Sequence, residues 1–557
     1  MAAKPKVKTY SSDTIHVDDS ISGDVWGDAS TLGKNEVGGA DVIYAGHGGA
    51  NIYGDALTMT DNARGGNDKI YGVDDGTNNL SGDAQTLSGS AHGGNDKLYG
   101  GADSYNTMLG DGFTLLDHAE GGSDSLYGGN VTNGFSVNLM FGDGYAFGSS
   151  SVSGAESHVE GGEDYIKGGD AIANDTVDGI DIFGFQIDSI ALNLGVGDAL
   201  FMDGHSEGGE DKLVGGNAIG SNGAVAVAVN ALVGDALVLA GHAEGEEDKL
   251  HGGDAHAADG SGALVLNLLV GDAAAMGDSV HGGSDEMCGG DAILDGTGAS
   301  ALAITANVMV GDSFLADGSV KFGNDAMTGG HGSAGADGYG LAINIMFGDL
   351  GGIGELATDL DSLIGGLGSL IGDSTGVISG GLTGGRDTMV GGDYAINGLV
   401  GDSYSLEGGA HGGNDKLTAG GIDSINFLVG DSVEAKTAAV GGNDTLTSGI
   451  SDDVMIGDFF LDDGSAIGGA DRFVFSVHNA NDVVLDFNGA EGDKISLKGF
   501  NVAGGFNDFA ALSARMTQDG DNVVINTDVT GDTAGDDTIT LYNVLIADLT
   551  AGNFIFG

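Results

Sequence analysis

Residues 83–111 read DAQTLSGSAHGGNDKLYGGADSYNTMLGD, and this stretch decides the fold. A glycine stands before Asp83 and before Asp111, and a further aspartate, Asp96, lies between them. Short pieces with β-forming residues are separated by glycine-rich turns, at 85–87, 97–99 and 107–109. Each piece is too short to be a stable strand alone, so each one needs a counterpart in a neighbouring copy.

The same two aspartate positions alternate along most of the chain, and repetition of this kind indicates a stack of similar coils. In eleven of fourteen copies the second aspartate follows thirteen residues after the first. The Gly-Asp row comprises Asp28, Asp55, Asp83, Asp111, Asp143, Asp198, Asp235, Asp272, Asp312, Asp349, Asp373, Asp402, Asp431 and Asp458. The second row, mostly preceded by Gly-Gly-x, comprises Asp41, Asp68, Asp96, Asp124, Asp164, Asp211, Asp248, Asp285, Asp325, Asp361, Asp387, Asp415, Asp444 and Asp471.

The repeat predicts an all-β fold, a parallel β-solenoid of about fourteen coils with three short strands in each coil. A strand gains a ladder of backbone hydrogen bonds when it stacks about 4.8 Å from its counterpart, and the repeated Leu, Ile, Met and Val then form a narrow core. An asparagine five residues before the Gly-Asp aspartate, as at Asn106, recurs in ten coils. It favours a hydrogen-bonded amide ladder, with a simple turn-forming asparagine as the alternative.

Extra residues collect between Asp164 and Asp349 and lengthen the strands there. The segments AVAVAVN at 224–230 and ALAITANVMV at 301–310 carry small apolar residues on both faces. Cover on both sides explains this pattern, so the middle coils are expected to have a broader, partly flat face. Lateral association with another copy of the chain is the favoured source of this cover, and the loops before these strands are the alternative.

Composition excludes several classes of protein. With 110 glycines and one proline among 557 residues and no Gly-X-Y period, collagen is excluded. Hydrophobic residues make up 41% of the chain, which disfavours simple disorder. A net charge of −65 argues against a nucleic-acid partner and against an anionic membrane surface. No apolar stretch approaches membrane-spanning length, so we expect no membrane insertion.

Stacked coils would place equivalent aspartates about 4.8 Å apart. Coulomb's law gives a repulsion of about 0.9 kcal/mol per neighbouring pair in water, and about 3.5 kcal/mol at an effective dielectric near 20. Over two rows this is comparable with the stability of a whole domain, so a cation between the coils is expected. Several Ca²⁺ ions suit the carboxylates and turn carbonyls, whereas Mg²⁺ needs tighter geometry and Zn²⁺ prefers nitrogen or sulfur. The predicted ligands are the whole Gly-Asp row and the second row up to Asp444, without Asp361.

Four segments resemble the calcium-binding repeats of RTX (repeats-in-toxin) proteins: GGNDKIYG from Gly65, GGNDKLYGG from Gly93, GGSDSLYGG from Gly121 and GGNDKLTAGG from Gly412. In that family, aspartates and glycine carbonyls bind calcium between turns of a parallel β-roll. The resemblance therefore implies calcium binding by the second row and implies less for the Gly-Asp row. The chain departs from the familiar pattern, because the nine-residue unit occurs only once in a coil of about 28 residues. The resemblance therefore does not imply the two-sided roll geometry for this chain.

Residues 471–557 resemble the C-terminal region of RTX exoproteins, in motifs such as DRFVFSVHNANDVVLDF, FNDFAAL, DTITLYNV and LTAGNFIFG. In that family the region caps the roll and carries an uncleaved type I secretion signal. The resemblance implies a secreted or cell-surface protein exported without an N-terminal signal peptide, and none is visible in residues 1–20. The predicted domains are a basic arm at 1–20, calcium-binding coils at 21–470, expanded at 164–349, and a small β-rich cap at 471–557.

Histidines recur just before the Gly-Gly turn: His92, His118, His158, His205, His242, His281 and His411. Two interpretations stay open, a polar filler at an exposed corner and a ladder that binds a transition metal.

An enzyme is not expected, because HExxH and GxxxxGK[ST] are absent and the repeats fill nearly the whole chain. The predicted function is a secreted calcium-binding structural protein of a surface layer, extracellular fibre or biofilm matrix. Such a protein would form a homo-oligomer or polymer, with the basic arm reaching an acidic neighbour end to end. The alternatives are a calcium-dependent adhesin that binds polysaccharide or cell surfaces and, third, a polysaccharide-modifying β-helix enzyme.

Overall fold

The computed structural model describes residues 8–148, 158–176, 180–182, 185–277, 279–295, 301–316, 319–335, 338–349, 377–378, 382–502, 505–529 and 537–557. They belong to two compact units. The first comprises Met1–Ala306, Asp317–Val320 and Ala334–Gly340, and the second comprises Asn307–Ala316, Lys321–Ser333 and Leu341–Gly557. Both units are almost entirely β, and their strands pair in parallel with few exceptions. The chain is therefore a parallel β-solenoid, as predicted.

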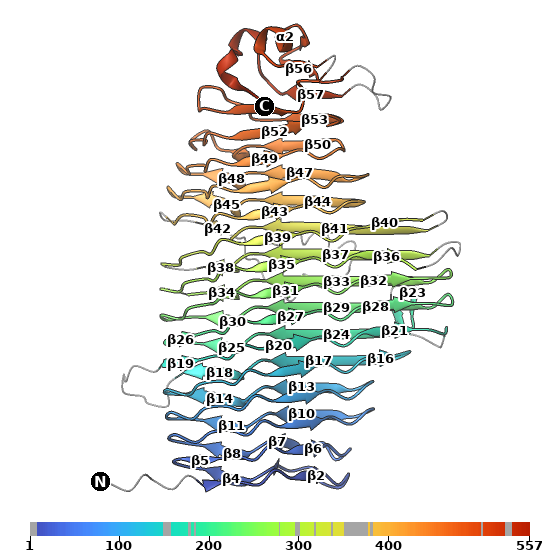
Figure 1. Ribbon diagram of the computed structural model, residues 1–557, viewed down its shortest axis with the longest axis vertical. Helices are drawn as coiled ribbons and strands as arrows, with labels where there is room; N and C mark the ends of the chain where they lie inside the picture. The colour runs from blue at the N-terminus through green and yellow to red at the C-terminus, as the bar shows by residue number, and fades with distance from the viewer. Residues whose placement is uncertain are drawn as a thin grey trace. The chain divides into compact units, whose positions relative to one another are not determined.

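In the first unit each coil gives one strand to each of three faces, and like strands stack in chain order (Figure 1). The first face ends at the Gly-Asp pairs and comprises β3 (Val25–Trp26), β7 (Asn51–Tyr53), β10 (Thr77–Ser81), β13 (Tyr105–Leu109), β17 (Phe135–Phe141), β24 (Ser189–Val196), β29 (Val225–Val233) and β33 (Gly262–Val270). The second face starts after those pairs and comprises β4 (Ala29–Leu32), β8 (Ala56–Met59), β11 (Ala84–Leu87), β14 (Gly112–Leu116), β18 (Gly144–Gly148), β25 (Ala199–Met202), β30 (Ala236–Leu239) and β34 (Ala273–Met276). The third face starts after the second-row aspartates and comprises β2 (Thr14–His16), β6 (Val42–Tyr44), β9 (Lys69–Tyr71), β12 (Lys97–Tyr99), β15 (Ser125–Tyr127), β20 (Tyr165–Lys167), β27 (Lys212–Val214), β31 (Lys249–His251) and β35 (Glu286–Cys288).

The second unit repeats the same three faces. Its first face contains β44 (Ala395–Val400), β47 (Ile425–Val429), β50 (Asp453–Ile456), β53 (Asn481–Val484) and β57 (Thr538–Leu541). Its second face contains β38 (Ser313–Ala316), β42 (Val377–Ile378), β45 (Ser403–Glu407), β48 (Ser432–Lys436) and β51 (Phe459–Asp462). Its third face contains β39 (Ala326–Thr328), β43 (Thr388–Val390), β46 (Lys416–Thr418), β49 (Thr445–Thr447), β52 (Arg472–Ser476), β54 (Lys494–Lys498) and β58 (Phe554–Phe556). Two first-face strands, β37 (Leu302–Val310) and β41 (Tyr339–Phe347), give residues to both units.

The coils stack in register, and each buries large apolar side chains from its three faces. On the third face Leu98 pairs with Ile70 and Leu126, and all three are fully buried. Residues on either side of Leu98 point outward, as the alternation of a β-strand requires. The three strands predicted for the copy at 83–111 are thus confirmed as β11, β12 and β13.

The asparagine ladder is also confirmed. Asn106 Nδ2 donates to Asn138 Oδ1 of the next coil at 2.8 Å, and Asn138 Nδ2 donates in turn to Asn193 Oδ1 at 2.8 Å. Each amide also bonds the backbone of its own coil, since Asn106 accepts from Gly101 N–H and donates to Gly101 C=O. These buried amides therefore have partners along the axis and within the coil, which pins the register of the stack.

A fourth face covers the widened middle coils of the first unit. It comprises β16 (Val131–Thr132), β21 (Ala171–Ala173), β28 (Ala218–Gly220), β32 (Ala255–Ala257) and β36 (Ala292–Leu294). Buried alanines such as Ala218, Ala226 and Ala263 pack between this face and the first face. The cover predicted for these strands is therefore confirmed, but the chain's own intervening segments provide it rather than the favoured second copy. Alanine allows this because its small side chain lets two backbones approach closely.

The remaining elements lie near the ends and corners. They are β1 (Lys8–Thr9) paired with β5 (Glu36–Val37), β19 (His158–Glu160) paired with β26 (His205–Glu207), the antiparallel pair β22 (Ile180–Ile182) and β23 (Phe185–Ile187), and β40 (Ser333–Ala334). In the second unit β57 pairs antiparallel with β56 (Asn522–Asn526), and β56 pairs antiparallel with β55 (Met516–Asp519). The same unit contains α2 (Phe509–Ser513), η2 (Ile546–Asp548) and η3 (Ala551–Asn553). None of the helices among the described residues is long and apolar enough to cross a lipid bilayer.

Candidate metal centre

The two aspartate rows lie at two turns of every coil and run side by side. Asp111 separates β13 of the first face from β14 of the second, while Asp96 directly precedes β12 of the third. The charges of Asp83, Asp124 and Asp68 all act on Asp96, so each second-row carboxyl has neighbours in both rows. The rows together form one double row of carboxyl groups, called here the carboxyl double row.

Second-row aspartates use one oxygen to tie consecutive coils together. Asp68 N–H donates to Asp96 Oδ1 at 2.6 Å, and Asp96 N–H donates to Asp124 Oδ1 at 2.6 Å. The same bond recurs in the second unit, for example from Asp444 N–H to Asp471 Oδ1 at 2.8 Å. This ladder explains why the aspartates keep a fixed place in the coil, since each carboxyl holds a backbone N–H of the coil before it.

Gly-Asp aspartates use one oxygen within their own coil. Gly94 N–H donates to Asp83 Oδ2 at 2.7 Å, and Gly122 N–H donates to Asp111 Oδ2 at 2.8 Å. The Asp83 carboxyl also meets the carboxyls of Asp55 and Asp111 in the adjacent coils. When both members of such a contact are ionised they present oxygen to oxygen, so the contact needs a proton or a cation between them.

The other oxygen of most second-row aspartates is buried and accepts no hydrogen bond. These atoms are Oδ2 of Asp41, Asp68, Asp96, Asp124, Asp164, Asp211, Asp248, Asp387, Asp415, Asp444 and Asp471. A buried ionised oxygen without a donor or a counter-charge is costly, and the cost recurs in coil after coil. The chain therefore has a repeated, unmet requirement for positive charge.

Burial dominates the electrostatics of the carboxyl double row. It raises the pKa of Asp41 to about 6, of Asp402 to about 7 and of Asp68 to about 9. The pKa of Asp96 is raised well above its ordinary value, first by burial and then by the charges of neighbouring aspartates. Without a cation the folded coils therefore favour protonated aspartates near neutral pH.

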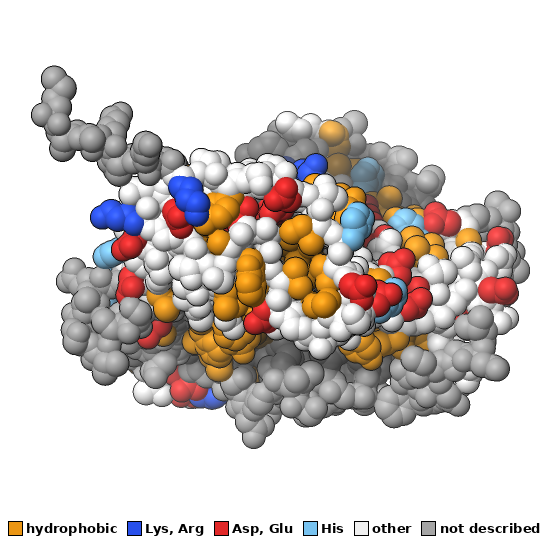
Figure 2. All heavy atoms as spheres, turned by 90° about the horizontal axis from the view of Figure 1, so that it is seen from below, with side chains coloured by type: hydrophobic (Ala, Val, Ile, Leu, Met, Phe, Trp, Pro, Cys, Tyr) orange, Lys and Arg blue, Asp and Glu red, His pale blue; other side chains and the backbone are white. Residues whose placement is uncertain are grey.

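Basic side chains do not meet this requirement among the described residues. Lys69 and Lys97 directly follow second-row aspartates, but they lie on the outward side of the third face and are exposed. The described lysines that form ion pairs are Lys8 and Lys436, and both pair with glutamates. On the face drawn in Figure 2, blue basic side chains are sparse beside red acidic ones.

The glycines of the motif leave room for the carboxyl double row. A Cβ on Gly82 would stand 1.8 Å from Gly110 O and 2.0 Å from Asp96 Oδ2. A Cβ on Gly94 would stand 1.5 Å from Gly66 O of the preceding coil. These glycines are therefore required by close approach of backbone and carboxylate oxygens, whichever ion neutralises the row.

Replacing Gly82 with alanine is expected to cost at least about 3 kcal/mol of unfolding free energy, because the carbonyl that blocks the new methyl belongs to the backbone. The matched control is Gly398→Ala on β44, where no atom lies within 4 Å of the added Cβ. There we expect a change within about 1 kcal/mol. Urea unfolding of both variants in millimolar calcium measures the difference, and equal losses would contradict the packing described.

The donor set fits calcium. The available atoms are carboxylate oxygens with no partner and the turn carbonyls that converge with them, as Gly110 O does with Asp96 Oδ2. All-oxygen sets of this kind suit a hard cation with a flexible geometry. The residues that would hold calcium are the aspartates of the carboxyl double row together with the glycine carbonyls of the same turns.

The structure places most predicted ligands in the carboxyl double row. Within the first unit the Gly-Asp row runs from Asp28 to Asp272 and the second row from Asp41 to Asp285, and all are buried except Asp28, which is half-buried. Within the second unit the rows contain Asp312, Asp349, Asp402, Asp431 and Asp458, and Asp325, Asp387, Asp415, Asp444 and Asp471, all buried.

The pairing of aspartates between neighbouring coils differs from the predicted alternation at one place in the second unit. Asp349 N–H donates to Asp402 C=O at 2.9 Å, and Asp325 N–H donates to Asp387 Oδ1 at 2.7 Å. Both rows therefore pass directly across the segment that contains Asp361 and Asp373, which lie outside the described residues. The sequence pattern counts a further pair of aspartates between these partners.

Sequence reasoning missed two members at the C-terminal end. Asp471 N–H donates to Asp493 Oδ1 at 2.9 Å, so Asp493 continues the second row. Asp486 accepts from Gly457 N–H and Asp458 N–H and so ends the Gly-Asp row. Asp493 carries a usable signal, since Asp-Lys-Ile at 493–495 repeats the motif of 68–70.

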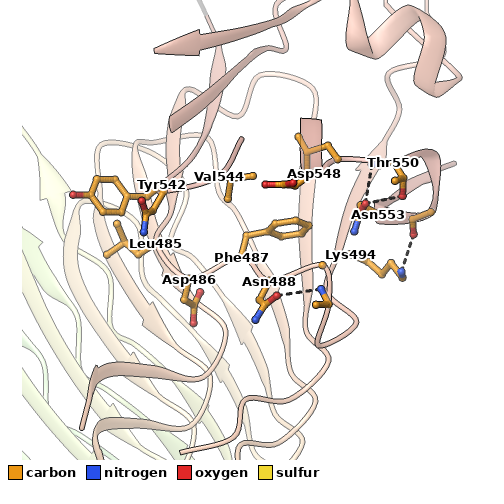
Figure 3. Close-up of a pocket in the computed structure, with 15 residues that line it drawn as sticks. Leu485, Asp486, Phe487, Asn488, Lys494, Tyr542, Val544, Asp548, Thr550 and Asn553 are labelled. Atoms are coloured by element: carbon orange, nitrogen blue, oxygen red, sulfur yellow. Dashed lines mark hydrogen bonds between the residues drawn. The ribbon is translucent and has the colours of Figure 1, made fainter. Parts of the chain in front are cut away.

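A cavity of about 770 Å³ lies in the C-terminal part of the second unit (Figure 3). Two of the charged side chains that line this cavity form hydrogen bonds with backbone groups. Lys494 Nζ donates to Gly552 C=O at 2.7 Å, and Asp486 holds the two N–H groups named above. These side chains therefore stabilise the end of the coil stack.

Comparisons with known proteins leave the family of this chain unassigned. No protein-family model matches the sequence, and no curated protein matches it. Among solved structures, the extracellular lipase LipA from Serratia marcescens aligns with a TM-score of 0.15 and 14% identity, over 57% of this chain and 40% of the lipase. The chain thus spans less than half of that lipase. At this TM-score the likeness carries no argument, and the fold rests on the strand pairing described above.

Proposed function

We propose that the chain is a secreted calcium-binding structural protein that folds on calcium outside the cell and then self-assembles. The observation that carries the proposal is the carboxyl double row, with its buried, unpartnered oxygens repeated through both units. Calcium would hold successive coils together there. The assembled form would serve in a surface layer, an extracellular fibre or a biofilm matrix.

Calcium would supply the charge that the coils lack. Neighbouring carboxylates about 4.8 Å apart repel by about 3.5 kcal/mol at an effective dielectric near 20. Repeated along both rows, this exceeds the 5–15 kcal/mol by which a domain is typically stable. A divalent ion at each turn removes the repulsion, so the free energy of calcium binding becomes free energy of folding.

Calcium-dependent folding would also allow the chain to be exported in an unfolded state. In cytosol, where free calcium is scarce, the ionised rows would keep the coils unfolded and able to pass through a secretion channel. Outside, millimolar calcium would bind the folded state and stabilise it by mass action. The resemblance of residues 471–557 to RTX exoproteins supports a type I route for this export.

Assembly is supported by open strand edges in the first unit. Among the described residues, β2, β3 and β4 each pair on one side only, with β6, β7 and β8. Such edges can add strands from another chain. The described part of the predicted basic arm folds back on its own chain, because β1 pairs with β5 and Lys8 Nζ lies 3.1 Å from Glu36 Oε1.

A second candidate function, adhesion, is favoured by one surface feature. The rings of Tyr44, Tyr71, Tyr99 and Tyr127 stack along the third face with centroids 4.8–5.0 Å apart. A regular row of half-exposed phenol groups offers hydrogen bonds to a repeating polymer such as a polysaccharide. The third candidate, a polysaccharide-modifying enzyme, is disfavoured because the paired carboxyls of the double row are buried away from any substrate.

Electron microscopy and light scattering of the pure chain, with calcium and with a chelator, test the proposal. We expect regular polymers in millimolar calcium and unfolded monomers in chelator. A folded monomer in calcium that binds polysaccharide or cells would favour the adhesin instead. A chain that is folded and unchanged in chelator would overturn calcium-dependent folding itself.

A further inference from the structure

Four consecutive coils of the first unit carry the tripeptide His-x-Glu at one place. The tripeptides are His118–Glu120, His158–Glu160, His205–Glu207 and His242–Glu244. Backbone pairing aligns them, since Glu120 pairs with Glu160, Glu160 with Glu207, and Glu207 with Glu244. The seven histidines that look like one row in sequence therefore separate into two columns. His118, His158, His205 and His242 form one column, while His92 and His281 stand at the two ends of the glutamate column. The seventh, His411, lies in the second unit, where it pairs with Thr383 and Val440.

The histidines and glutamates of these tripeptides point outward together. The middle residues Ala119, Val159 and Ala243 are fully buried. Alternation along a strand then turns the residues before and after them to the outside. The eight side chains and the two end histidines form one surface strip, called here the His-Glu strip, which is separate from the buried carboxyl double row.

The side chains of the His-Glu strip lie within reach of one another. A ligand atom from each of His158, Glu160 and Glu207 lies within 4.8 Å of the other two. His158 Nε2 is 2.8 Å from Glu160 Oε1, and the rings of His205 and His242 stack at 4.9 Å. At the ends, His92 Nδ1 is 2.5 Å from Glu120 Oε2, and His281 Nδ1 is 3.5 Å from Glu244 Oε1.

The chemistry of the His-Glu strip differs from that of the carboxyl double row. Imidazole nitrogen next to carboxylate oxygen is the donor set of zinc and related transition metals, whereas calcium prefers oxygen alone. The four stacked glutamates also repel one another, and a divalent cation between coils relieves that repulsion. The strip therefore offers both the ligands and the charge that such an ion requires.

We propose that the His-Glu strip binds a transition-metal dication such as Zn²⁺, with His158, Glu160 and Glu207 as its ligands. Three protein ligands leave a tetrahedral ion one position for water or for a group from another molecule. Tetrahedral bonds of 2.0–2.2 Å bring ligand atoms to about 3.4 Å from one another. The side chains of His158 and Glu160 are 41% and 47% exposed, so small rotations suffice to close the present separations.

Zinc titration of the full chain by calorimetry tests the proposal, in millimolar calcium so that the carboxyl double row is already neutralised. We expect at least one zinc ion per chain with micromolar or tighter affinity at pH 7.5. His158→Ala should weaken that binding by at least about tenfold. Cobalt(II), used as a coloured substitute for zinc, should give the absorption bands of a tetrahedral site in the wild-type chain, and these bands should fade in the variant.

The matched control is His47→Ala, which removes an exposed imidazole that pairs with Asp19 outside the strip. It should leave zinc binding unchanged. Glu207→Gln is the second variant, with an expected loss similar to that of His158→Ala. Circular dichroism in calcium checks that each variant is folded. Zinc binding that is unaffected by both strip variants, or absent from the calcium-loaded chain, would overturn the proposal.

Discussion

Chelation of calcium at pH 7.5 is expected to abolish most of the parallel β-structure of the chain, and added calcium is expected to restore it. The physical reason is the carboxyl double row, whose ionised aspartates cannot be buried next to one another without positive charge. Far-ultraviolet circular dichroism during a calcium titration measures the effect. Because many turns share the ions, the transition should be steep in calcium concentration.

Magnesium at the same concentration is the control for ionic strength and divalent charge. It should restore much less structure, because it dehydrates reluctantly and demands octahedral geometry. Retention of the full β-signal in chelator at pH 7.5 would contradict the role given to calcium.

Acid is expected to fold the calcium-free chain, and this is the second large effect. Burial raises the pKa of Asp402 to about 7 and of Asp68 to about 9, and it raises the pKa of Asp111 well above its ordinary value. In the unfolded chain an aspartate titrates near 3.9. A pKa that is higher in the folded state stabilises the fold fully below the unfolded value, and this stabilisation is lost as pH rises through the folded value. The metal-free solenoid should therefore be stable near pH 4–5 and unfold between about pH 6 and 9.

The measurement is circular dichroism of metal-free protein, prepared by removing calcium at pH 8 and then titrated to lower pH at low protein concentration. Dilution limits precipitation near the isoelectric point of about 4.1. In millimolar calcium the same titration should show β-structure from mildly acidic to alkaline pH, because the ion replaces the protons. A calcium-free chain that is most stable at pH 7–8 would contradict the electrostatics described here.

Much of the fold follows from the sequence because each coil repeats the same local pattern. Asp-Lys-Leu at 96–98 places an outward-facing residue and then a buried one after the second-row aspartate, and the structure repeats this order along the third face. The asparagine ladder follows for the same reason, since a stack in register brings Asn106 next to Asn138. Periodicity alone is sufficient to predict the strands and their pairing where the coil length hardly varies.

Features that depend on coil length were harder to predict. His92 directly precedes its Gly-Gly turn, whereas Ala119 and Glu120 separate His118 from its turn. The two histidines therefore stand two positions apart in the coil and fall in different columns, a difference in spacing that the sequence interpretation did not use. The fourth face forms from inserted segments such as β28, whose role depends on packing against β29 rather than on any repeated motif. The pairing of Asp349 with Asp402 and of Asp325 with Asp387 was likewise not predicted, because the sequence alternation places other aspartates between them.

The central claim is that calcium neutralises the carboxyl double row, and counting bound calcium in the folded chain tests it most directly. The measurement is elemental analysis after equilibrium dialysis at pH 7.5, with circular dichroism recorded on the same samples. The account predicts on the order of ten calcium ions per chain, bound over the same narrow concentration range in which β-structure appears. A folded solenoid at pH 7.5 that holds fewer than about one calcium ion per chain would contradict it.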